Sequence, residues 1–261
     1  MSVVAKLGGH ALDDLAPEGA TLEALAEDLA TLGRAGERVV LVHGGGPQIE
    51  ALLSSLHVES VFVDGLRVTD AETMGYVAMA LAAVNAALVA GLVAHGVAAV
   101  GLSGLDAGLL VSRPIGPTWD RAGDTPVVTT RALEAQWAAG LVPVVSPIAA
   151  DEGGRLLNCN ADTVAGALAG ALGADLVLLS DVDQLRTDPE DPATSLARVS
   201  AAEVATLLAS GAAREGMRPK VRAALDALAG GAGRVVLANG RRPHALASAL
   251  AREGRHTEVV A

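Results

Sequence analysis

Short β-branched runs alternate with Ala- and Leu-rich runs along the whole chain. This alternation is typical of parallel strands joined by helical crossovers, since parallel neighbours cannot be linked by a tight turn. It predicts a layered α/β fold around a mainly parallel sheet. The predicted strands cover residues 3–7, 38–42, 97–102, 142–146, 175–180 and 235–238, and the predicted helices cover 21–34, 47–56, 73–96 and 160–172.

Between the strands at 97–102 and 142–146 lies a region with Pro and Gly residues that is expected to form a hairpin. A fresh strand begins just after Gly173, so a lobe boundary is expected there. The predicted units are an N-terminal lobe, residues 1–173, and a C-terminal lobe, residues 174–261.

The composition limits both the core and the partners of the chain. Hydrophobic residues make up 51% and aromatic residues only 2%, so small aliphatic side chains must fill the core. A net charge of −11 argues against a nucleic-acid partner or an anionic membrane surface, which would need a basic face. The single cysteine, Cys159, excludes an internal disulfide, and no secretory signal is visible at the N-terminus. These features indicate a cytoplasmic protein.

Residues 73–96 carry no formally charged side chain and are long enough to cross a bilayer. The run is mostly Ala and Val, contains Gly, Asn and His, and has no flanking basic residues, so a membrane span is rejected. The alternative is a helix buried on nearly all sides, which suggests a subunit interface. Thr69 and Glu72 have capping-box spacing and are expected to open this helix.

The chain has seventeen arginines but only two lysines, Lys6 and Lys220. Lysine is a compact point charge, whereas arginine is a broad planar fork, and phosphoryl transfer needs positive charges close to the migrating group. Lys6 ends an apolar strand before Gly8 and Gly9, and Lys220 precedes a helical run. These contexts favour a catalytic pair, and the alternative is two residual surface lysines.

A strand at 38–42 runs into His43, three glycines and Pro47, followed by a helix. Successive peptide N–H groups and the helix dipole could bind an anion at such a turn, although a plain tight connection would use the same residues. The sequence contains neither a P-loop nor a dinucleotide-binding glycine motif, which removes the main support for those two classes.

Three further segments carry polar groups at expected element ends. Arg67, between turn residues and the long helix, could grip a carboxylate. Residues 158–162 place Asn158, Asn160 and Asp162 before an Ala-rich helix, and helix capping accounts for one of the three. Residues 180–183 end a strand with two aspartates, which could contact a nucleotide. The alternative is a pair of aspartates that only forms a turn.

Taken in order, these motifs resemble the amino-acid-kinase family and, within it, the acetylglutamate kinases. The match covers nearly the whole chain: residues 6–9, 42–47, 64–69, 158–162, 180–183, 216–217 and 219–221. The resemblance implies the amino-acid-kinase (carbamate-kinase-like) fold, a three-layer α/β/α sandwich with a mainly parallel central sheet. It also implies that the acyl amino acid binds in the N-terminal lobe and ATP in the C-terminal lobe. It implies direct phosphorylation of the side-chain carboxylate of N-acetyl-L-glutamate, giving N-acetyl-L-glutamyl 5-phosphate in arginine biosynthesis.

The same resemblance assigns roles to individual residues. Lys6 and Lys220 would stabilise the transferring phosphoryl group and Asp162 would orient them. Substrate would be held by Gly44, Gly45, Arg67, Asn158 and Asn160. Nucleotide would be met by Gly8, Gly9, Ser180, Asp181, Val182, Asp183, Ala212, Ala213 and Arg214. Mg²⁺ would be carried mainly by the ATP phosphates, and no protein metal site is expected. The histidines other than His43 show no metal-ligand spacing and are given no role.

Three residues depart from the family pattern: Gln184 replaces a common glycine, Arg218 an aliphatic residue, and Leu105 a frequent lysine. The last is a feature of kinases that act on carrier-linked aminoadipate, so that activity is kept as the alternative, and a non-catalytic amino-acid sensor is a second one. The chain starts at its first strand, without the extra helix of arginine-inhibited hexamers, which predicts an arginine-insensitive homodimer. Cys159 is expected to be a buried filler rather than a nucleophile.

Overall fold

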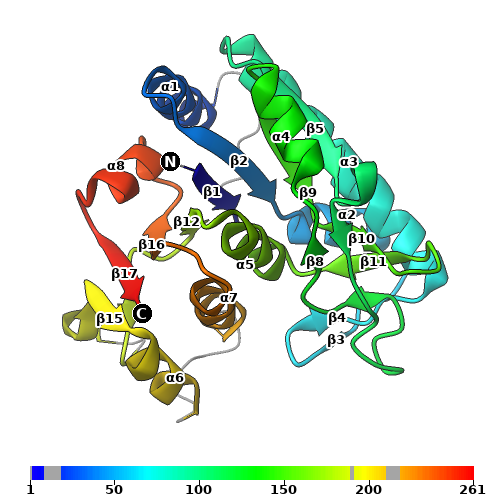
Figure 1. Cartoon of the computed structure of the whole chain (residues 1–261). Coiled ribbons are helices and arrows are strands. Elements are labelled where there is room, and N and C mark those ends of the chain that lie inside the picture. Colours follow the sequence, from blue (N-terminus) through cyan, green and yellow to red (C-terminus); the bar gives the residue numbers. More distant parts are fainter. Residues whose placement is uncertain (1, 9–18, 189–190, 210–217) are drawn as a thin grey trace.

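The computed structural model describes residues 2–8, 19–188, 191–209 and 218–261, coloured in Figure 1. The predicted nucleotide-site residues Gly9, Ala212, Ala213 and Arg214 lie outside this part of the chain. Its helices are α1 (Ala20–Arg34), α2 (Gly46–Ser55), α3 (Ala71–Ala94), α4 (Arg131–Ala138), α5 (Ala161–Leu172), α6 (Ala201–Ala209), α7 (Arg218–Ala229) and α8 (Ala245–Ala251).

A large mixed sheet forms the centre of the molecule, in the order β15-β17-β16-β12-β1-β2-β9-β5. Its strands are β1 (Ser2–Leu7), β2 (Arg38–His43), β5 (Ala99–Ser103), β9 (Val142–Ser146), β12 (Asp175–Ser180), β15 (Arg198–Ser200), β16 (Val235–Asn239) and β17 (His256–Val260). All neighbours from β16 to β5 are parallel, while β17 runs antiparallel to β16. The predicted parallel strands are therefore confirmed.

Alternate residues of the central strands face opposite helical layers. Val4 and Val40 pack in one core with α5 and α7, whereas Val3 and Val39 pack in another with α1, α3 and α8. A strand covered on both faces needs apolar residues at every position, which is why these segments read as continuous hydrophobic runs. Figure 1 shows the sheet between α1 and α8 on one side and α5 and α7 on the other.

A smaller sheet lies beyond β9, in the order β7-β11-β10-β6-β8. It is built from β6 (Leu110–Val111), β7 (Ala122–Gly123), β8 (Val127–Val128), β10 (Ile148–Ala150) and β11 (Leu156–Cys159). Two antiparallel pairs form separate two-stranded sheets: β3 (Phe62–Val63) with β4 (Leu66–Arg67), and β13 (Leu185–Arg186) with β14 (Ser195–Leu196). The hairpin expected before β9 is present as the antiparallel pair β6 and β8.

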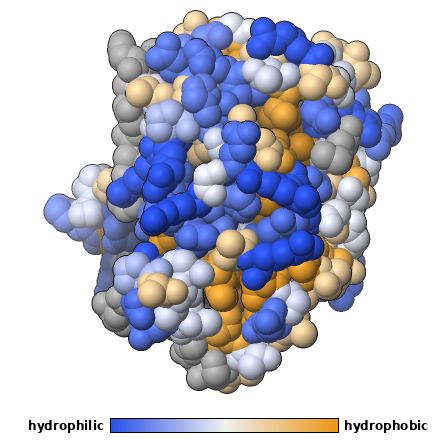
Figure 2. All heavy atoms as spheres, turned by 90° about the vertical axis from the view of Figure 1, so that its left-hand side faces the viewer, coloured by the Kyte–Doolittle hydropathy of each residue, from blue (hydrophilic) through white to orange (hydrophobic). Residues whose placement is uncertain are grey.

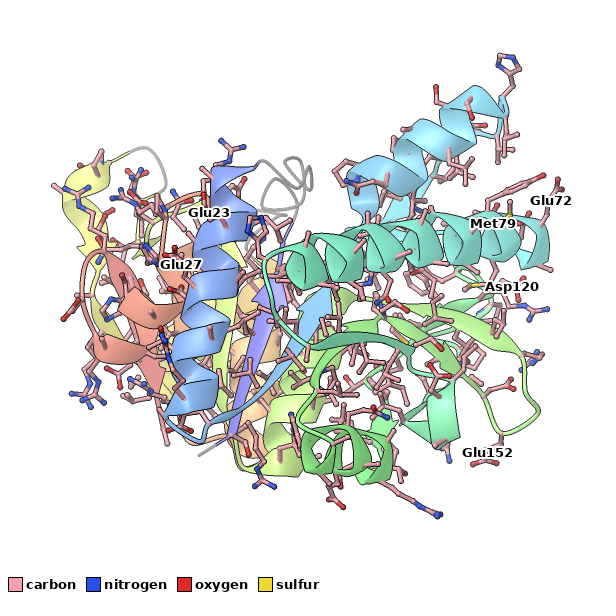
Figure 3. All side chains as sticks on the ribbon, turned by 90° about the horizontal axis from the view of Figure 1, so that it is seen from above. Glu23, Glu27, Glu72, Met79, Asp120 and Glu152 are labelled. Atoms are coloured by element: carbon pink, nitrogen blue, oxygen red, sulfur yellow. The ribbon has the colours of Figure 1, made fainter. Side chains whose placement is uncertain are left out.

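Helix α3 corrects two predictions. Its N-cap is Asp70, whose carboxylate accepts the Thr73 N–H at 2.7 Å, while the Thr69 hydroxyl donates to the Arg67 carbonyl, so the expected capping box is wrong. The helix is also not buried on nearly all sides. One of its faces is exposed, and in Figure 3 the side chain of Met79 lies on the outer side of the helix.

By length and composition, α3 is the one helix of the described residues that could cross a membrane. Its other face packs in the two cores that contain Val77, Leu81 and Leu88, which identifies it as a core helix with one open side. The face of α8 and β17, shown in Figure 2, is largely hydrophilic over its upper and middle parts.

The expected lobe boundary falls between α5 and β12. The central sheet continues across it, because β1 pairs with β12 from Val3↔Asp175 to Leu7↔Leu179. Both predicted lobes therefore contribute strands to one sheet, and their functional residues gather along the same edge.

Candidate functional site

The carboxyl ends of β1, β2, β12 and β16 meet at one edge of the sheet, because these strands are parallel neighbours. In this arrangement Lys6 lies beside Val42 and Leu178, close to the ends of all three strands. Ligands of open α/β sheets bind beyond this edge. The motifs that the sequence singled out, 6–8, 43–47 and 180–183, are brought together there.

The ammonium group of Lys6 pairs with the carboxylate of Asp162, with 2.8 Å between Nζ and Oδ1. Both residues are buried, with exposed fractions of 7% and 5%. Lys6 faces the α5 side of the sheet, as Val4 does, and Asp162 lies in the first turn of α5. A buried charge is stable only when it is paired, so each residue fixes the position of the other.

The pair depends on the glycine two residues after Lys6. A Cβ atom at Gly8 would lie 2.8 Å from both the Lys6 Nζ and the Leu179 carbonyl oxygen. The Gly8 N–H also donates to that carbonyl at 2.9 Å, which holds the end of β1 against β12. Only glycine allows this approach of backbone and ammonium group.

Asn160 is the N-cap of α5, and its side-chain oxygen accepts the N–H groups of Asp162 and Thr163 at 2.8 and 3.2 Å. The cap sets where the helix begins and thereby places Asp162 against Lys6. Of the three polar residues predicted at 158–162, Asn160 is therefore the one whose side-chain oxygen is used to cap the helix. Asn158, on β11, instead donates its amide to the Thr69 hydroxyl at 3.3 Å.

Helices α5 and α7 run parallel and pack closely. A Cβ at Gly166 would lie 2.8 Å from the Ala223 carbonyl oxygen, and one at Gly170 would lie 3.1 Å from the Gly230 Cα. Because the contacts advance along both helices together, their N-terminal turns lie at the same end. Lys220, one turn before Ala223, therefore lies in the first turn of α7, at the same end of the two packed helices as Asp162.

The glycine turn after β2 is held by its backbone. The Gly44 N–H donates to the Leu7 carbonyl at 3.1 Å, and the Gly45 carbonyl accepts the Ile49 N–H at 2.8 Å as α2 begins. Pro47 lies in the first turn of α2, where its missing N–H costs no hydrogen bond. Among the described residues, the Gly45 N–H has no hydrogen-bond partner.

Arg67 is buried although it carries a full charge. Its Nη1 donates to Glu50 Oε2 at 3.0 Å and to the Ser60 hydroxyl, and the Phe62 ring lies 4.6 Å from the guanidinium. The hydrogen bonds from Ser60 and Arg67 hold the pKa of Glu50 below its usual value. These contacts immobilise one edge of the guanidinium and leave the other edge for a planar anion.

A pocket of about 270 Å³ joins these groups. Its walls carry most of the predicted acceptor site. The lining residues are Lys6, Gly44, Gly45, Gly46, Pro47, Ile49, Phe62, Gly65, Leu66, Arg67, Leu81, Ala122, Pro147, Asn158, Cys159, Asn160, Ala161 and Asp162. The lining includes two cations, Lys6 and Arg67, each of which is paired with a carboxylate.

Cys159 lines the pocket but is chemically unreactive there. Burial raises the pKa of its thiol to about 12, so the thiol stays protonated at neutral pH. The prediction of a buried filler rather than a nucleophile agrees with this environment.

The residues predicted to contact the nucleotide, Ser180 to Asp183, lie at the carboxyl end of β12, along the same edge of the sheet. The Asp183 carboxylate is occupied: Oδ1 accepts from Arg242 Nε and from the Asn239 amide, each at 2.9 Å, and Oδ2 accepts from Arg242 Nη2 at 2.8 Å. Hydrogen bonds from Arg242 and then Asn239 lower the pKa of Asp183. Asp183 therefore ties the turn after β12 to the loop after β16, and Asp181, by contrast, is exposed.

Three features of the site have no counterpart in the sequence predictions. They are the ion pair of Glu50 with Arg67, the ion pair of Arg242 with Asp183, and the polar contacts of the His43 ring. Glu50 and Arg67 are 17 residues apart, and Asp183 and Arg242 are 59 apart. No local spacing signals such pairs. His43 was noted beside the glycines, and its proximity to them was the available signal.

Comparisons with known proteins agree with this geometry. Residues 1–239 match the amino acid kinase family. An acetylglutamate kinase of Symbiobacterium thermophilum is 44% identical over 257 residues, covering 94% of this chain and 86% of that protein.

Solved structures share the fold. An N-acetylglutamate synthase from Neisseria gonorrhoeae, in complex with coenzyme A and N-acetyl-glutamate, superposes with a TM-score of 0.83 at 29% identity. That alignment takes in 100% of this chain, which spans 59% of the synthase. A Giardia carbamate kinase superposes with a TM-score of 0.69 at 17% identity, over 99% of this chain and 98% of the kinase. The predicted fold class is thereby confirmed.

Proposed function

The chain belongs to the amino acid kinase family, and from this premise we propose that it is an acetylglutamate kinase. It transfers the terminal phosphoryl group of ATP to the side-chain carboxylate of N-acetyl-L-glutamate, forming N-acetyl-L-glutamyl 5-phosphate in arginine biosynthesis. The observation that carries the proposal is the buried pair of Lys6 and Asp162 at an anion-binding pocket. The relative from Symbiobacterium thermophilum supports the choice of acceptor.

The reaction is a direct in-line displacement. A carboxylate oxygen of the acceptor attacks the terminal phosphorus while the bond to the bridging oxygen of ADP breaks, so no phosphoenzyme forms. Charge develops on the equatorial and bridging oxygens. Lys6 stabilises this charge from the β1 side and Lys220 from the start of α7, and Asp162 keeps Lys6 in place.

The acceptor binds in the pocket of about 270 Å³. The open edge of the Arg67 guanidinium pairs with the α-carboxylate, and Asn158 donates to the same end of the molecule. The unpartnered N–H of Gly45 points to the reacting end, and Asn160, through its amide nitrogen, contributes a further donor.

ATP enters as its magnesium complex and lies along the carboxyl ends of β12 and β16. Gly8 lets the phosphates approach the backbone, and Ser180 to Val182 contact the nucleotide, with Asp183 shaping their turn. The phosphates are the main ligands of Mg²⁺ in this proposal, as the resemblance to the family implies.

The test is turnover of ATP by the purified protein with N-acetyl-L-glutamate as acceptor. Aminoadipate-type acceptors, free and carrier-linked, form the second arm, because Leu105 is a feature of kinases for such substrates. Turnover with N-acetyl-L-glutamate alone supports the proposal, and a preference for the second arm would replace it with an aminoadipate-type kinase. Binding without turnover in either arm would indicate a sensor.

Substitution of either lysine tests the mechanism. Lys6→Ala and Lys220→Ala are each expected to lower kcat by about 10²–10³-fold, since each removes one donor to the transition-state charge. Arg113→Ala is the control, because Arg113 is an exposed cation that does not line the pocket. Circular dichroism establishes that the variants fold. Full turnover in either lysine variant would contradict the mechanism.

We further propose that the protein is a cytoplasmic homodimer insensitive to arginine. The exposed face of α3 is the surface that a second copy would cover. Strong inhibition of turnover by arginine, or a hexamer in light scattering, would contradict this proposal.

A further inference from the structure

His43 is fully buried at the end of β2, directly before the glycine turn, and the mechanism above gives it no role. Its ring makes two polar contacts. Nδ1 lies 2.7 Å from the Gly44 carbonyl oxygen, and Nε2 lies 3.0 Å from the side-chain nitrogen of Asn85.

The chemistry of these partners fixes the tautomer of His43. A carbonyl oxygen can only accept, so Nδ1 carries the hydrogen. The Asn85 amide nitrogen donates to the Val144 carbonyl at 2.9 Å with one hydrogen and faces Nε2 with the other, so Nε2 accepts. The ring is therefore the neutral Nδ1–H form. Burial also favours the neutral ring, because it lowers the pKa of His43 to about 4.

Asn85 is itself fixed. It projects from α3 onto the strands β2 and β9, where both hydrogens of its amide are used. Its side-chain oxygen lies over Gly101 of β5, where a Cβ would come within 2.0 Å of it. Any larger residue at position 101 would displace Asn85, so Gly101, Asn85 and His43 form a chain of contacts that ends at the Gly44 carbonyl.

Both polar groups of Gly44 are then occupied, the N–H by Leu7 and the carbonyl by His43. In a planar trans peptide the carbonyl of one residue and the N–H of the next point in opposite directions. Holding the Gly44 carbonyl toward His43 turns the Gly45 N–H away from it. Gly45 lines the pocket and His43 does not, so the opposite direction is the pocket.

We propose that His43, held by Asn85, is a positioning residue that aims the Gly45 N–H at an oxygen anion of the reacting carboxylate or phosphoryl group. The inference rests on the proposed kinase activity and adds a residue to it. His43 touches no reacting atom, so it acts through the peptide between Gly44 and Gly45.

Two substitutions separate the hydrogen bond from the filling of space. His43→Phe keeps the ring and removes both nitrogens, and the expected result is a kcat lower by about 10²-fold, the effect of a misplaced group in a reacting site. The KM for ATP is expected to stay unchanged. His43→Asn restores a donor near the position of Nδ1, and its kcat is expected to recover most of the loss.

A kcat of His43→Phe equal to that of the wild type would overturn the proposal. So would equal losses in His43→Phe and His43→Asn, because that result means that the ring only fills space. If the wild type itself shows no turnover with N-acetyl-L-glutamate, the kinase proposal fails instead.

A measurement on the unsubstituted protein covers the case in which His43→Phe does not fold. Long-range proton–nitrogen NMR of the protein labelled with ¹⁵N-histidine reports which ring nitrogen carries the hydrogen. The expected signal is a neutral Nδ1–H ring between pH 5 and pH 8 that is absent from His43→Asn. A neutral Nε2–H ring, or a protonated ring, would overturn the arrangement regardless of the reaction catalysed.

Discussion

At the scale of single residues, Gly8 leaves no room for a side chain, since a Cβ there would lie 2.8 Å from both the Lys6 ammonium group and the Leu179 carbonyl oxygen. Gly8→Ala is expected to push Lys6 from its place and lower kcat by about 10²-fold. Gly33→Ala on α1 is the control, because a Cβ there meets nothing within 4 Å. Steady-state kinetics of both variants test this, and equal activities would show that Lys6 tolerates the methyl group.

His43 also predicts a pH dependence of folding stability. The pKa of His43 is about 4 in the folded protein, against 6.5 for an ordinary histidine. Between these two pH values the unfolded chain therefore binds a proton that the folded protein does not. The contribution of the neutral His43 ring to folding stability is complete above pH 6.5 and is lost as the pH falls toward 4. The free energy of unfolding falls by about 3 kcal/mol at most through this loss. The free energies of unfolding of the wild type and of His43→Asn, measured with urea from pH 4.5 to 7.5, test this pH dependence.

The variant lacks the titrating ring, so its free energy of unfolding is expected to fall less on acidification than that of the wild type. Parallel pH curves for the two proteins would contradict the assignment. His244 cannot mimic the effect, because its pKa is raised by Asp28, a shift of the opposite sign.

The sequence predicted residues whose chemistry depends on type and local context, and it missed those that depend on contacts across the fold. Lys6 and Asp162 could be paired in advance, since one ends a strand and the other opens a helix. Asp183 was expected to meet nucleotide, but its carboxylate is held by Arg242. Exposed aspartates and paired aspartates have the same letter in a sequence.

At the scale of elements, the bond between Asp183 and Arg242 joins two turns that flank the nucleotide end. Arg242→Ala is expected to raise the KM for ATP about fivefold, the equivalent of about 1 kcal/mol, because the turn after β12 loses its partner. The Arg242 side chain is 55% exposed, so global stability is expected to change by less than about 1 kcal/mol.

Arg241→Ala provides the matched control for Arg242→Ala. The contact of Arg241 with Asn239 is made by its backbone N–H and survives the substitution. Kinetics at varied ATP concentration distinguish the two variants, and equal KM values for both would remove the role given to Arg242.

Elements were predicted well where the residue pattern and the burial agree. The strands β9 and β12 have the predicted bounds, since their continuous apolar runs are covered on both faces. The start of α3 was misplaced because Thr69 and Asp70 are both good caps, and only the backbone path decides between them. The open face of α3 was missed because its residues are apolar on every side, so hydrophobic periodicity carries no information there.

At the scale of the whole molecule, α3 presents a stripe of exposed small and apolar residues: Gly75, Met79, Ala82, Ala83, Ala86, Ala90 and Val93. Such a surface suits a second copy of the same helix, since small side chains allow close packing. Figure 3 shows Met79 directed outward from the molecule.

If the protein is the proposed dimer, Ala86→Glu is expected to convert it to a monomer, because the substitution buries an unpaired charge at the contact. Sedimentation equilibrium measures the mass, and Ala202→Glu on exposed α6 is the control that should leave the dimer intact. A monomeric wild type, or a dimeric Ala86→Glu variant, would contradict this use of α3.

The pairing of β1 with β12 has a consequence for how the two substrates are brought together. Five consecutive residue pairs join the two predicted lobes through β1 and β12, so a hinge that separated these two strands would have to break backbone hydrogen bonds. An opening of the site that keeps these pairs intact must come from bending of the sheet or from the segments beyond the strand ends.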